Sequence, residues 1–433
     1  MANQSLFTDD FKAAPYWWDA APRPEIEIAA QPGRADVVVI GSGYTGLCAS
    51  LQLARAGRDV VVLDAESAGW GCSARNGGLV STGLKPGFED LAPHHGAAAA
   101  RAIVTEGQSA LAFIKDFVAE EDLACDFHVG GKFFGAHTPA HFEKIAAAAN
   151  TQPEGLAVKA HVVPRAEQAR EIDTEFYHGG VVFEDHASID PAKYHNALLA
   201  KVRAAGATIV PHCRAGAIRR DGDRFTVESA CGTVDAGQVL VATNGYTDAV
   251  SPWLRRRVIP IGSYMIATEP LPAAVMDRIM PTARTFSDTR KVVYYYRPSP
   301  DRRRVIFGGR VTTNETDPRV SGPLLMRDLV ALFPALAGTR ISHSWNGFVA
   351  YTFDHLPHLG QNDGVYYAAG YCGSGIALAS YCGTKIGQQM LGLAAGRTAL
   401  DGLTNPTRPF YTGRPWFLGA AVAFYRWRDR AGL

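Results

Sequence analysis

Two short runs of branched apolar residues near the start of the chain predict buried strands. Asp36–Ile40 and Asp59–Asp64 carry valine, isoleucine or leucine at every inner position, which is typical of a parallel strand covered on both faces. Between them, apolar and small residues recur at helical spacing from Leu47 to Ala54, and Gly57 is a plausible helix terminator. The pattern predicts one βαβ unit of about thirty residues.

Similar patterns predict elements farther along the chain. Asp190 followed by Pro191 is typical of a helix start, and this helix is expected to end at Gly206. Val292–Arg297 and Arg304–Gly308 predict a hairpin around the polar segment between them. Further short strands are predicted at Thr208–Val210, Ala217–Ile218, Arg224–Glu228 and Gln238–Ala242.

Two stretches predict helices whose partners the pattern leaves open. Between Pro93 and Glu121 there is no further proline, and good helix formers predict helices of a lid or substrate domain. The apolar segment Trp416–Tyr425 is followed by two arginines. A helix packed on the protein is favoured there, and a helix lying on a membrane surface is the alternative.

Composition narrows the class of protein. The chain has 433 residues, 47% hydrophobic and 20% charged, with a formal net charge of +1. This balance is typical of a soluble globular protein, and it argues against a dedicated nucleic-acid binder. The seven cysteines are odd in number and include no C-x-x-C pair. Reduced thiols and a cytoplasmic location are therefore expected. Residues 1–12 lack the apolar core of a signal peptide, and no apolar run reaches the ~18 residues of a membrane span.

A glycine motif gives the predicted βαβ unit its chemistry. Gly41, Gly43 and Gly46 form a G-x-G-x-x-G directly after the first strand. Their roles would be a tight turn, a close approach of the backbone to a pyrophosphate, and close packing of helix on sheet. The helix N-terminus offers positive charge to the phosphates, and Asp64 can accept hydrogen bonds from a ribose. The unit therefore predicts dinucleotide binding.

A second glycine-rich loop favours FAD over a nicotinamide cofactor. The segment Trp70–Gly78 follows the acidic residue closely and is rich in Gly, Ser and Asn. Such a loop can run along a flat ring system and donate backbone N–H groups to it. An ordinary surface loop is the alternative.

Four motifs, taken in order, resemble one family. They are Ile40–Gly46, Gly69–Gly78, Ala242–Gly245 and Ala369–Ala377. Together they are similar to the D-amino-acid-oxidase-like (glycine/sarcosine oxidase) superfamily of FAD oxidoreductases. Within it the chain looks most like the gamma-glutamylputrescine oxidase group, where an Arg-Asn-Gly-Gly loop recurs. The resemblance covers nearly the whole chain.

This resemblance implies an α/β (α+β overall) fold in which two domains interleave. The implied Rossmann-like FAD-binding domain is discontinuous and comprises residues 32–88, 186–262 and 342–400. A mixed-sheet substrate-binding domain would comprise residues 89–185 and 263–341. Residues 401–433 would form a C-terminal tail or helix.

The resemblance also implies which residues hold the cofactor. The implied set is Gly41, Gly43, Thr45, Gly46, Asp64, Ala65, Gly71, Cys72, Ser73, Arg75, Asn76, Gly77, Gly78, Leu79, Ala215, Thr243, Asn244, Gly245, Gly373, Ser374, Gly375 and Ile376. Covalent attachment is not expected, because Val349 and Arg75 stand where relatives carry a linking cysteine or histidine. Leu79 also departs from the glutamine that tends to follow the Arg-Asn-Gly-Gly of the gamma-glutamylputrescine group.

Substrate contacts are predicted at five positions. Family members often hold a carboxylate with an arginine and tyrosines of the sheet, which points to Tyr294, Tyr296 and Arg297. The alternatives are that the tyrosines form sheet core and the arginine is a surface charge. Asn76 and Tyr371 are further candidates, although Tyr371 could merely pack. Arg75 has the alternative role of bracing its loop.

The expected activity is oxidation of the C–N bond of an amine. An N-substituted amino acid or a γ-glutamylated amine would transfer hydride to flavin N5, and the imine would hydrolyse to an aldehyde or oxo acid plus an amine. Oxygen or a quinone-type acceptor would reoxidise the flavin. An FAD monooxygenase and a flavin-binding subunit of a larger complex are the alternatives. The pattern predicts no metal site, because neither His94-His95 nor His355–His358 has partner ligands at metal spacing. It leaves the oligomeric state open.

Overall fold

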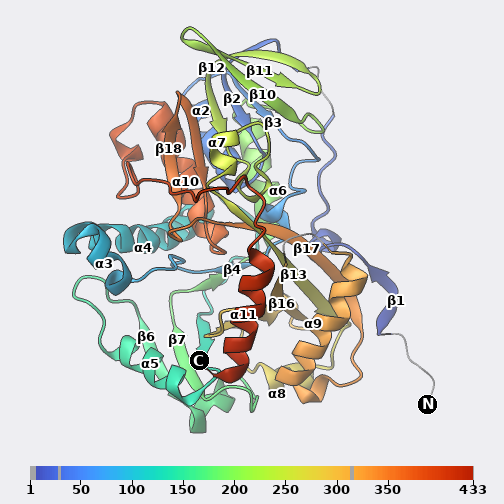
Figure 1. Ribbon diagram of the computed structural model, residues 1–433. Helices are drawn as coiled ribbons and strands as arrows, with labels where there is room; N and C mark the ends of the chain where they lie inside the picture. Colours follow the sequence, from blue (N-terminus) through green and yellow to red (C-terminus); the bar gives the residue numbers. More distant parts are fainter. Residues whose placement is uncertain (1–5, 28–30, 313–315, 433) are drawn as a thin grey trace.

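Two mixed sheets, each with its own helices, form the architecture (Figure 1). The computed structural model describes residues 6–27, 31–312 and 316–432. The first sheet comes from three separate parts of the chain, and the second is made largely of the segments between them. The predicted α/β fold with interleaved parts is therefore confirmed, whereas the domain boundaries stay a prediction.

The first sheet has a parallel centre. Strands β12, β2, β3 and β9 run parallel in that order, and β19 also pairs parallel with β12. An antiparallel extension, β10–β11, continues from β12, and β18 pairs antiparallel with β19. The bounds are β2 (Arg34–Ile40), β3 (Val60–Leu63), β9 (Thr208–Val210), β10 (Ala215–Asp221), β11 (Arg224–Ser229), β12 (Gly232–Val241), β18 (His358–Asn362) and β19 (Val365–Ala369).

Four helices form the core beneath this sheet. They are α2 (Tyr44–Arg55), α4 (Ala97–Glu120), α6 (Pro191–Ala204) and α10 (Gly375–Met390). Leu47 of α2, Ile114 of α4 and Leu198 of α6 are fully buried in one cluster with the inner valines of β2 and β3. The predicted βαβ unit is confirmed, because α2 connects the parallel strands β2 and β3.

Local signals set the starts of these helices as the sequence indicates. The Asp190 carboxylate accepts hydrogen bonds from the N–H groups of Ala192 and Lys193, both at 3.0 Å, which caps α6. Helix α4 confirms the helix predicted after Pro93. Its apolar face packs with α10 and the first core, although the sequence pattern indicated a lid or substrate domain for it.

The second sheet has nine strands and a separate aromatic core. Its order is β1-β17-β13-β16-β15-β14-β5-β7-β6. The predicted hairpin is confirmed, since β15 and β16 pair antiparallel with Pro298 opposite Val305. The bounds are β1 (Phe7–Lys12), β5 (Lys132–Gly135), β6 (Ala160–Pro164), β7 (Gly179–Phe183), β13 (Ile259–Thr268), β14 (Thr285–Asp288), β15 (Tyr295–Pro298), β16 (Val305–Thr312) and β17 (Ile341–Tyr351).

The remaining elements are short or peripheral. Helices α5 (Pro139–Asn150), α8 (Ala273–Ile279) and α9 (Pro318–Leu332) pack around the second sheet. The others are α1 (Trp17–Ala20), α3 (Phe88–His95), α7 (Pro252–Arg255), the two-stranded pair β4 (Leu79–Val80) and β8 (Ala187–Ser188), and the 3₁₀ turns at Cys72–Ala74, Arg165–Arg170, Asn244–Tyr246, Pro334–Leu336 and Ala394–Gly396.

Helix α11 (Leu418–Ala431) lies in the lower half of the view in Figure 1, in front of the second sheet. Leu418 and Val422 are buried, and the Asp429 carboxylate accepts hydrogen bonds from the N–H groups of Lys291 and Val292, both at 2.9 Å. The predicted packed helix is confirmed, while Trp427 on its outer side stays exposed.

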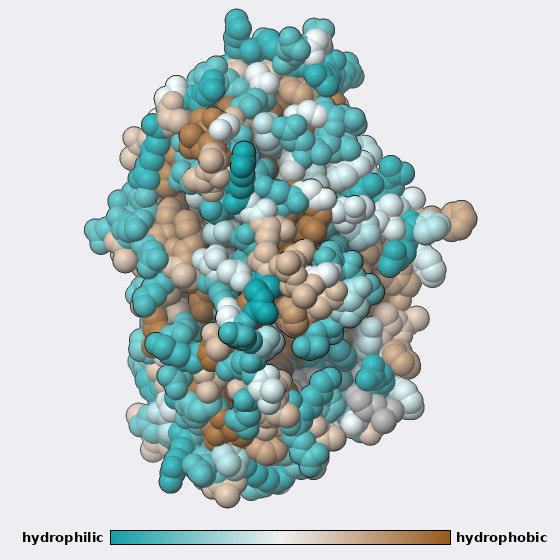
Figure 2. All heavy atoms as spheres, turned by 90° about the vertical axis from the view of Figure 1, so that its left-hand side faces the viewer, coloured by the Kyte–Doolittle hydropathy of each residue, from teal (hydrophilic) through white to brown (hydrophobic). Residues whose placement is uncertain are grey.

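The surface is mainly polar on the face seen in Figure 2. Figure 2 shows a face on which hydrophilic residues predominate and hydrophobic ones lie in separate patches, as is ordinary for a globular surface. None of the helices in the described ranges is long and apolar enough to cross a membrane.

Candidate active site

A cavity of about 790 Å³ runs between the two sheets. This volume lies in the range of about 300 to 1,000 Å³ that ligand sites occupy. Its wall includes most of the predicted cofactor residues, from distant parts of the chain: Gly41, Gly43, Thr45, Asp64, Ala65, Gly71, Cys72, Ser73, Arg75, Asn76, Gly77, Leu79, Ala215, Thr243, Asn244, Gly373, Ser374, Gly375 and Ile376. Their individual contacts with a cofactor stay predictions.

Three predicted cofactor residues pack behind the wall instead. A Cβ on Gly46 would lie 2.0 Å from the Gly41 carbonyl oxygen, so the glycine lets α2 approach the turn closely. A Cβ on Gly78 would lie 2.2 Å from the Ile189 carbonyl oxygen, and one on Gly245 would lie 3.2 Å from Phe348. At these three positions glycine therefore allows the segments behind the cavity wall to pack closely together: Gly46, Gly78 and Gly245.

The start of α2 forms one end of the cavity. Gly41 has φ of +106°, a conformation that favours glycine, and its turn brings Gly43 to the N-cap of α2. The Asp64 carboxylate accepts hydrogen bonds from the Ser42 N–H at 2.8 Å and from the Glu66 N–H at 3.0 Å. Asp64 thus fixes the turn at the place where a ribose is expected, and Ala215 lines the same end.

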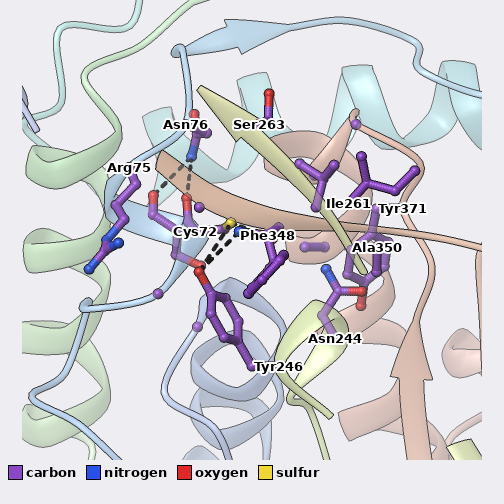
Figure 3. A pocket seen from close by; sticks show the side chains of 18 of the residues that line it. Cys72, Arg75, Asn76, Asn244, Tyr246, Ile261, Ser263, Phe348, Ala350 and Tyr371 are labelled. Atoms are coloured by element: carbon purple, nitrogen blue, oxygen red, sulfur yellow. Dashed lines mark hydrogen bonds between the residues drawn. The ribbon is translucent and has the colours of Figure 1, made fainter. Parts of the chain in front are cut away.

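The glycine-rich loop is held by the side chain of Asn76 (Figure 3). The Asn76 amide donates to the carbonyl oxygens of Ser73 at 2.9 Å and Cys72 at 3.2 Å, and its oxygen accepts from the Gly78 N–H at 2.9 Å. Asn76 also lines the cavity. Because its amide is engaged within the loop, its geometry supports positioning of the loop rather than contact with a substrate.

Arg75, which also lines the cavity, braces the same loop. Its guanidinium lies over the Trp70 ring at 4.2 Å and donates to the Asn346 carbonyl oxygen at 3.1 Å. The Trp345 indole donates back to the Arg75 carbonyl oxygen at 2.7 Å. These contacts join the loop to strand β17 of the second sheet, which agrees with the bracing alternative for Arg75.

The other end of the cavity receives the N-terminus of α10. Gly373 has φ of +92° and Ser374 occupies the N-cap without a side-chain cap bond. A Cβ at Gly375 would meet nothing within 4 Å, so the backbone faces open space. The first-turn N–H groups thus offer a positive dipole end to a ligand that carries negative charge.

Tyr371 and Asn244 hold this end in place. The Tyr371 hydroxyl lies 2.6 Å from the Thr45 hydroxyl, and the Asn244 side-chain oxygen accepts from the Gly370 N–H at 3.0 Å. Figure 3 shows the side chains of Tyr371 and Asn244 on the same side of the pocket. Burial raises the pKa of Tyr371 well above its ordinary value. Tyr371 lines the cavity and its hydroxyl ties α10 to α2, so its contact with a substrate stays a prediction.

The cavity wall on the second sheet differs from the sequence prediction. Tyr295 lines the cavity, whereas Tyr294, Tyr296 and Arg297 do not. The Tyr295 hydroxyl lies 2.7 Å from the Ser263 hydroxyl, and burial raises its pKa to about 12. Strand alternation separates Tyr295 from its neighbours correctly, but the sequence alone does not say which face meets the cavity.

Two glycines in strand β16, which pairs with β15, are the sequence feature that indicates the position of the Tyr295 side chain. A Cβ on Gly308, which pairs with Tyr295 across the sheet, would lie 2.2 Å from the Tyr295 ring. The adjacent pair Gly308-Gly309 therefore makes room for an aromatic side chain to lie across β16. Two glycines inside a predicted strand mark such a close approach.

Tyr294 and Tyr296, which do not line the cavity, pack against other residues of the second sheet and its neighbours. Tyr296 is fully buried, its ring stacks on Phe286 with centroids 5.2 Å apart, and its hydroxyl donates to the Tyr177 hydroxyl at 3.2 Å. The Tyr294 ring lies under the Arg290 guanidinium at 3.3 Å. This geometry gives no support to substrate contacts by the two tyrosines, and it agrees with the alternative that they form sheet core.

Arg297 is buried rather than solvated. Its guanidinium donates to the carbonyl oxygens of Ile189 at 2.8 Å and Gly78 at 3.2 Å. Burial lowers its pKa to about 10. The side chain therefore joins the glycine-rich loop to β15, and neither the predicted carboxylate contact nor the surface alternative matches its position.

The residues fit the predicted FAD. The first turns of two helices, α2 and α10, face one cavity, each with glycine backbone beside it. An elongated ligand with a diphosphate at one helix and a polar ring at the other matches this arrangement.

Comparison with known proteins identifies the family. The family model described as FAD dependent oxidoreductase, abbreviated DAO, matches residues 36–389. The chain is 30% identical over 426 residues to a probable oxidoreductase OrdL of Rhizobium meliloti, covering 96% of this chain and 97% of the relative. It is 29% identical over 407 residues to gamma-glutamylputrescine oxidoreductase of Escherichia coli, covering 92% and 93%.

Solved structures agree at the level of the fold. Glycine oxidase from Geobacillus kaustophilus superposes with a TM-score of 0.74 at 17% identity, covering 87% of this chain and 99% of that one. L-proline dehydrogenase from P. horikoshii gives 0.70 at 18% identity, covering 90% and 99%. The resemblance inferred from the four motifs is confirmed, and the protein belongs to the DAO family of FAD-dependent oxidoreductases.

Proposed function

We propose that the protein oxidises the C–N bond of an amine held at the second-sheet end of the cavity, the amine being an N-substituted amino acid or a γ-glutamylated amine. The observation that carries the proposal is one continuous cavity with a dinucleotide cradle at one end and a chamber lined by Tyr295, Ser263 and His355 at the other. Relatives named for gamma-glutamylputrescine and glycine, both of which carry an amine, support the substrate class.

Residues of the first sheet would hold the cofactor. The turn at Gly41 and Gly43 and the Asp64 carboxylate suit its diphosphate and ribose, and Ala215 suits the adenine end. The loop fixed by Asn76 and the start of α10 would hold the ring system. Bound FAD supplies a two-electron acceptor for the hydride that leaves the carbon next to nitrogen.

The chain's own contribution is positioning and the exclusion of water. Tyr295 and Trp345 bring aromatic surface to the chamber, and Leu418 and Val422 of α11 close it from outside. A secondary or primary amine must be neutral to release hydride, and a chamber lined by cations favours the neutral form of the amine. Lys85 and Lys132 lie in this wall, so their charges would favour release of the amine proton to solvent before the hydride leaves.

An anaerobic screen tests this function. Purified protein loaded with FAD is mixed with primary amines, N-alkyl amino acids and γ-glutamylated amines, and the flavin absorbance is followed. We expect bleaching by at least one of these classes and recovery on admission of oxygen or a quinone. Bleaching by dithionite but by no amine would contradict the proposal, and rapid NADPH consumption would favour a monooxygenase.

A further inference from the structure

The charges that line the cavity are divided between its two ends. Among its described wall residues the only carboxylates are Asp64, Glu66 and Asp248, and all three belong to the first-sheet side near Arg214. The opposite chamber carries Lys85, Lys132 and Lys291 together with His355. Such a division predicts a ligand that is anionic at the chamber end.

Lys85 and Lys132 come from different elements and line the same part of the cavity. Lys132 stands on β5 of the second sheet and is partly exposed, and Lys85 lies in the loop after β4 and is exposed. That loop packs on the start of α10, since a Cβ on Gly83 would lie 2.2 Å from the Ser374 Cβ. Both side chains line the cavity, and the charge of Lys85 acts on Lys132, which places the two lysines on one chamber of the cavity.

Within the described part of the chain these three lysines have no carboxylate at ion-pair distance, although the charge of Asp288 acts on Lys132. None of Lys85, Lys132 and Lys291 forms an ion pair there, in contrast to Lys12, Lys159 and Lys193. The Lys132 ammonium lies over the Phe134 ring, 5.2 Å from the ring centroid. Cations that lack a protein counterion in a concave site are typical of a site for an anionic ligand.

The electrostatics agree with this geometry. Burial and the nearby charge of Lys85 lower the pKa of Lys132 to about 8. Burial, together with the charges of Lys85 and Lys291, lowers the pKa of His355 despite the opposing charge of Asp354. The basic groups therefore repel one another across one chamber, and an anion that enters it would relieve this repulsion.

We propose that the amine oxidised here carries two carboxylates, and that Lys85 and Lys132 bind the second one. This inference rests on the proposed function and narrows it. An amino-acid carboxylate alone would leave most of the chamber's positive charge unbalanced. An N-substituted acidic amino acid fits better than a γ-glutamylated diamine, whose far amine adds a further cation.

Binding to the FAD-loaded protein tests the inference without turnover. Isothermal titration calorimetry compares glutarate with glutaramate, in which an amide replaces one carboxylate at nearly the same shape. We expect glutarate to bind at least tenfold more tightly. Lys85→Gln and Lys132→Gln should each remove most of that preference, and Lys132→Arg should keep it. The control is Lys115→Gln, on an exposed position of α4, which should behave like the wild type.

Turnover gives the second arm of the test. N-methylglutamate should bleach the flavin at least tenfold more efficiently than N-methylglutamine, chiefly through a lower KM, and the two glutamine variants should raise that KM. Equal binding of glutarate and glutaramate, or an unchanged preference in variants that retain FAD, would overturn the inference. A glutarate preference without bleaching by any amine would instead contradict the proposed function and leave the carboxylate site supported.

Discussion

Replacement of Arg297 distinguishes a structural arginine from one that binds substrate. Sequence resemblance places this residue on a substrate carboxylate, whereas the structure buries it against the carbonyl oxygens of Gly78 and Ile189. Arg297→Met keeps the apolar stem and removes the guanidinium. We expect a less stable protein that binds FAD more weakly, because the loop that carries Gly78 loses its anchor to β15.

The size of the effect follows from the contacts. Two hydrogen bonds from a charged donor to other segments are worth about 3 to 6 kcal/mol together. Burial of the charge opposes them. A pKa lowered from 12.5 to about 10 corresponds to a penalty of about 3 kcal/mol at about 1.4 kcal/mol for each pH unit. The net loss of stability is therefore about 1 kcal/mol.

Urea denaturation and fluorescence titration with FAD measure these two effects. Arg203→Met provides the control, since Arg203 lies on α6 and is exposed. If part of the loss falls on the loop, the FAD dissociation constant should rise about tenfold for each 1.4 kcal/mol. A variant with unchanged stability and FAD affinity, but a raised KM for carboxylated amines only, would refute the structural role of Arg297.

Further predictions concern the loop, the strand and the charge of the chamber. Asn76→Ala should weaken FAD binding at least about tenfold in fluorescence titrations, because several loop hydrogen bonds are lost together. Tyr295→Phe should change the kinetics of flavin reduction in stopped-flow measurements, whereas Tyr296→Phe should lower stability by about 1 kcal/mol without a kinetic change. The folded-state pKa of Lys132 is about 8, below its ordinary value of 10.5, in surroundings that include Lys85, Asp288 and His186. The affinity of glutarate should therefore fall as pH rises through about 8, because Lys132 loses its charge. The contribution of Lys132 to the free energy of unfolding should increase between pH of about 8 and 10.5, because in that range Lys132 is protonated in the unfolded chain and neutral in the folded one. Acid precipitation should release FAD into the supernatant, as expected for a non-covalent cofactor.

The first part of the fold could be predicted from sequence because its signals are local. Two valine-rich strands, a glycine turn and a helix of suitable length together specify a βαβ unit, and the structure confirms it. The capped start of α6 at Asp190 is equally local. These features depend on neighbours within a few residues, so the chain reveals them before any tertiary contact is known.

The substrate side could not be predicted in the same way. Alternation along Tyr294–Arg297 separates two faces, but which face meets the cavity depends on how the second sheet packs against the first. Lys85 and Lys132 carried no motif, since a single lysine in a sequence is ordinarily a solvated charge. Their proximity arises from a loop and a strand that only the tertiary structure brings together.

The most direct test of the account is an anaerobic single turnover with product analysis. FAD-loaded protein is mixed with excess N-methylglutamate, and the bleached flavin is compared with the carbonyl product released after hydrolysis. The account predicts one molecule of aldehyde or oxo acid for each FAD reduced. The account would be contradicted if dithionite reduces the flavin but neither N-methylglutamate nor any amine of the anaerobic screen reduces it with release of a carbonyl product.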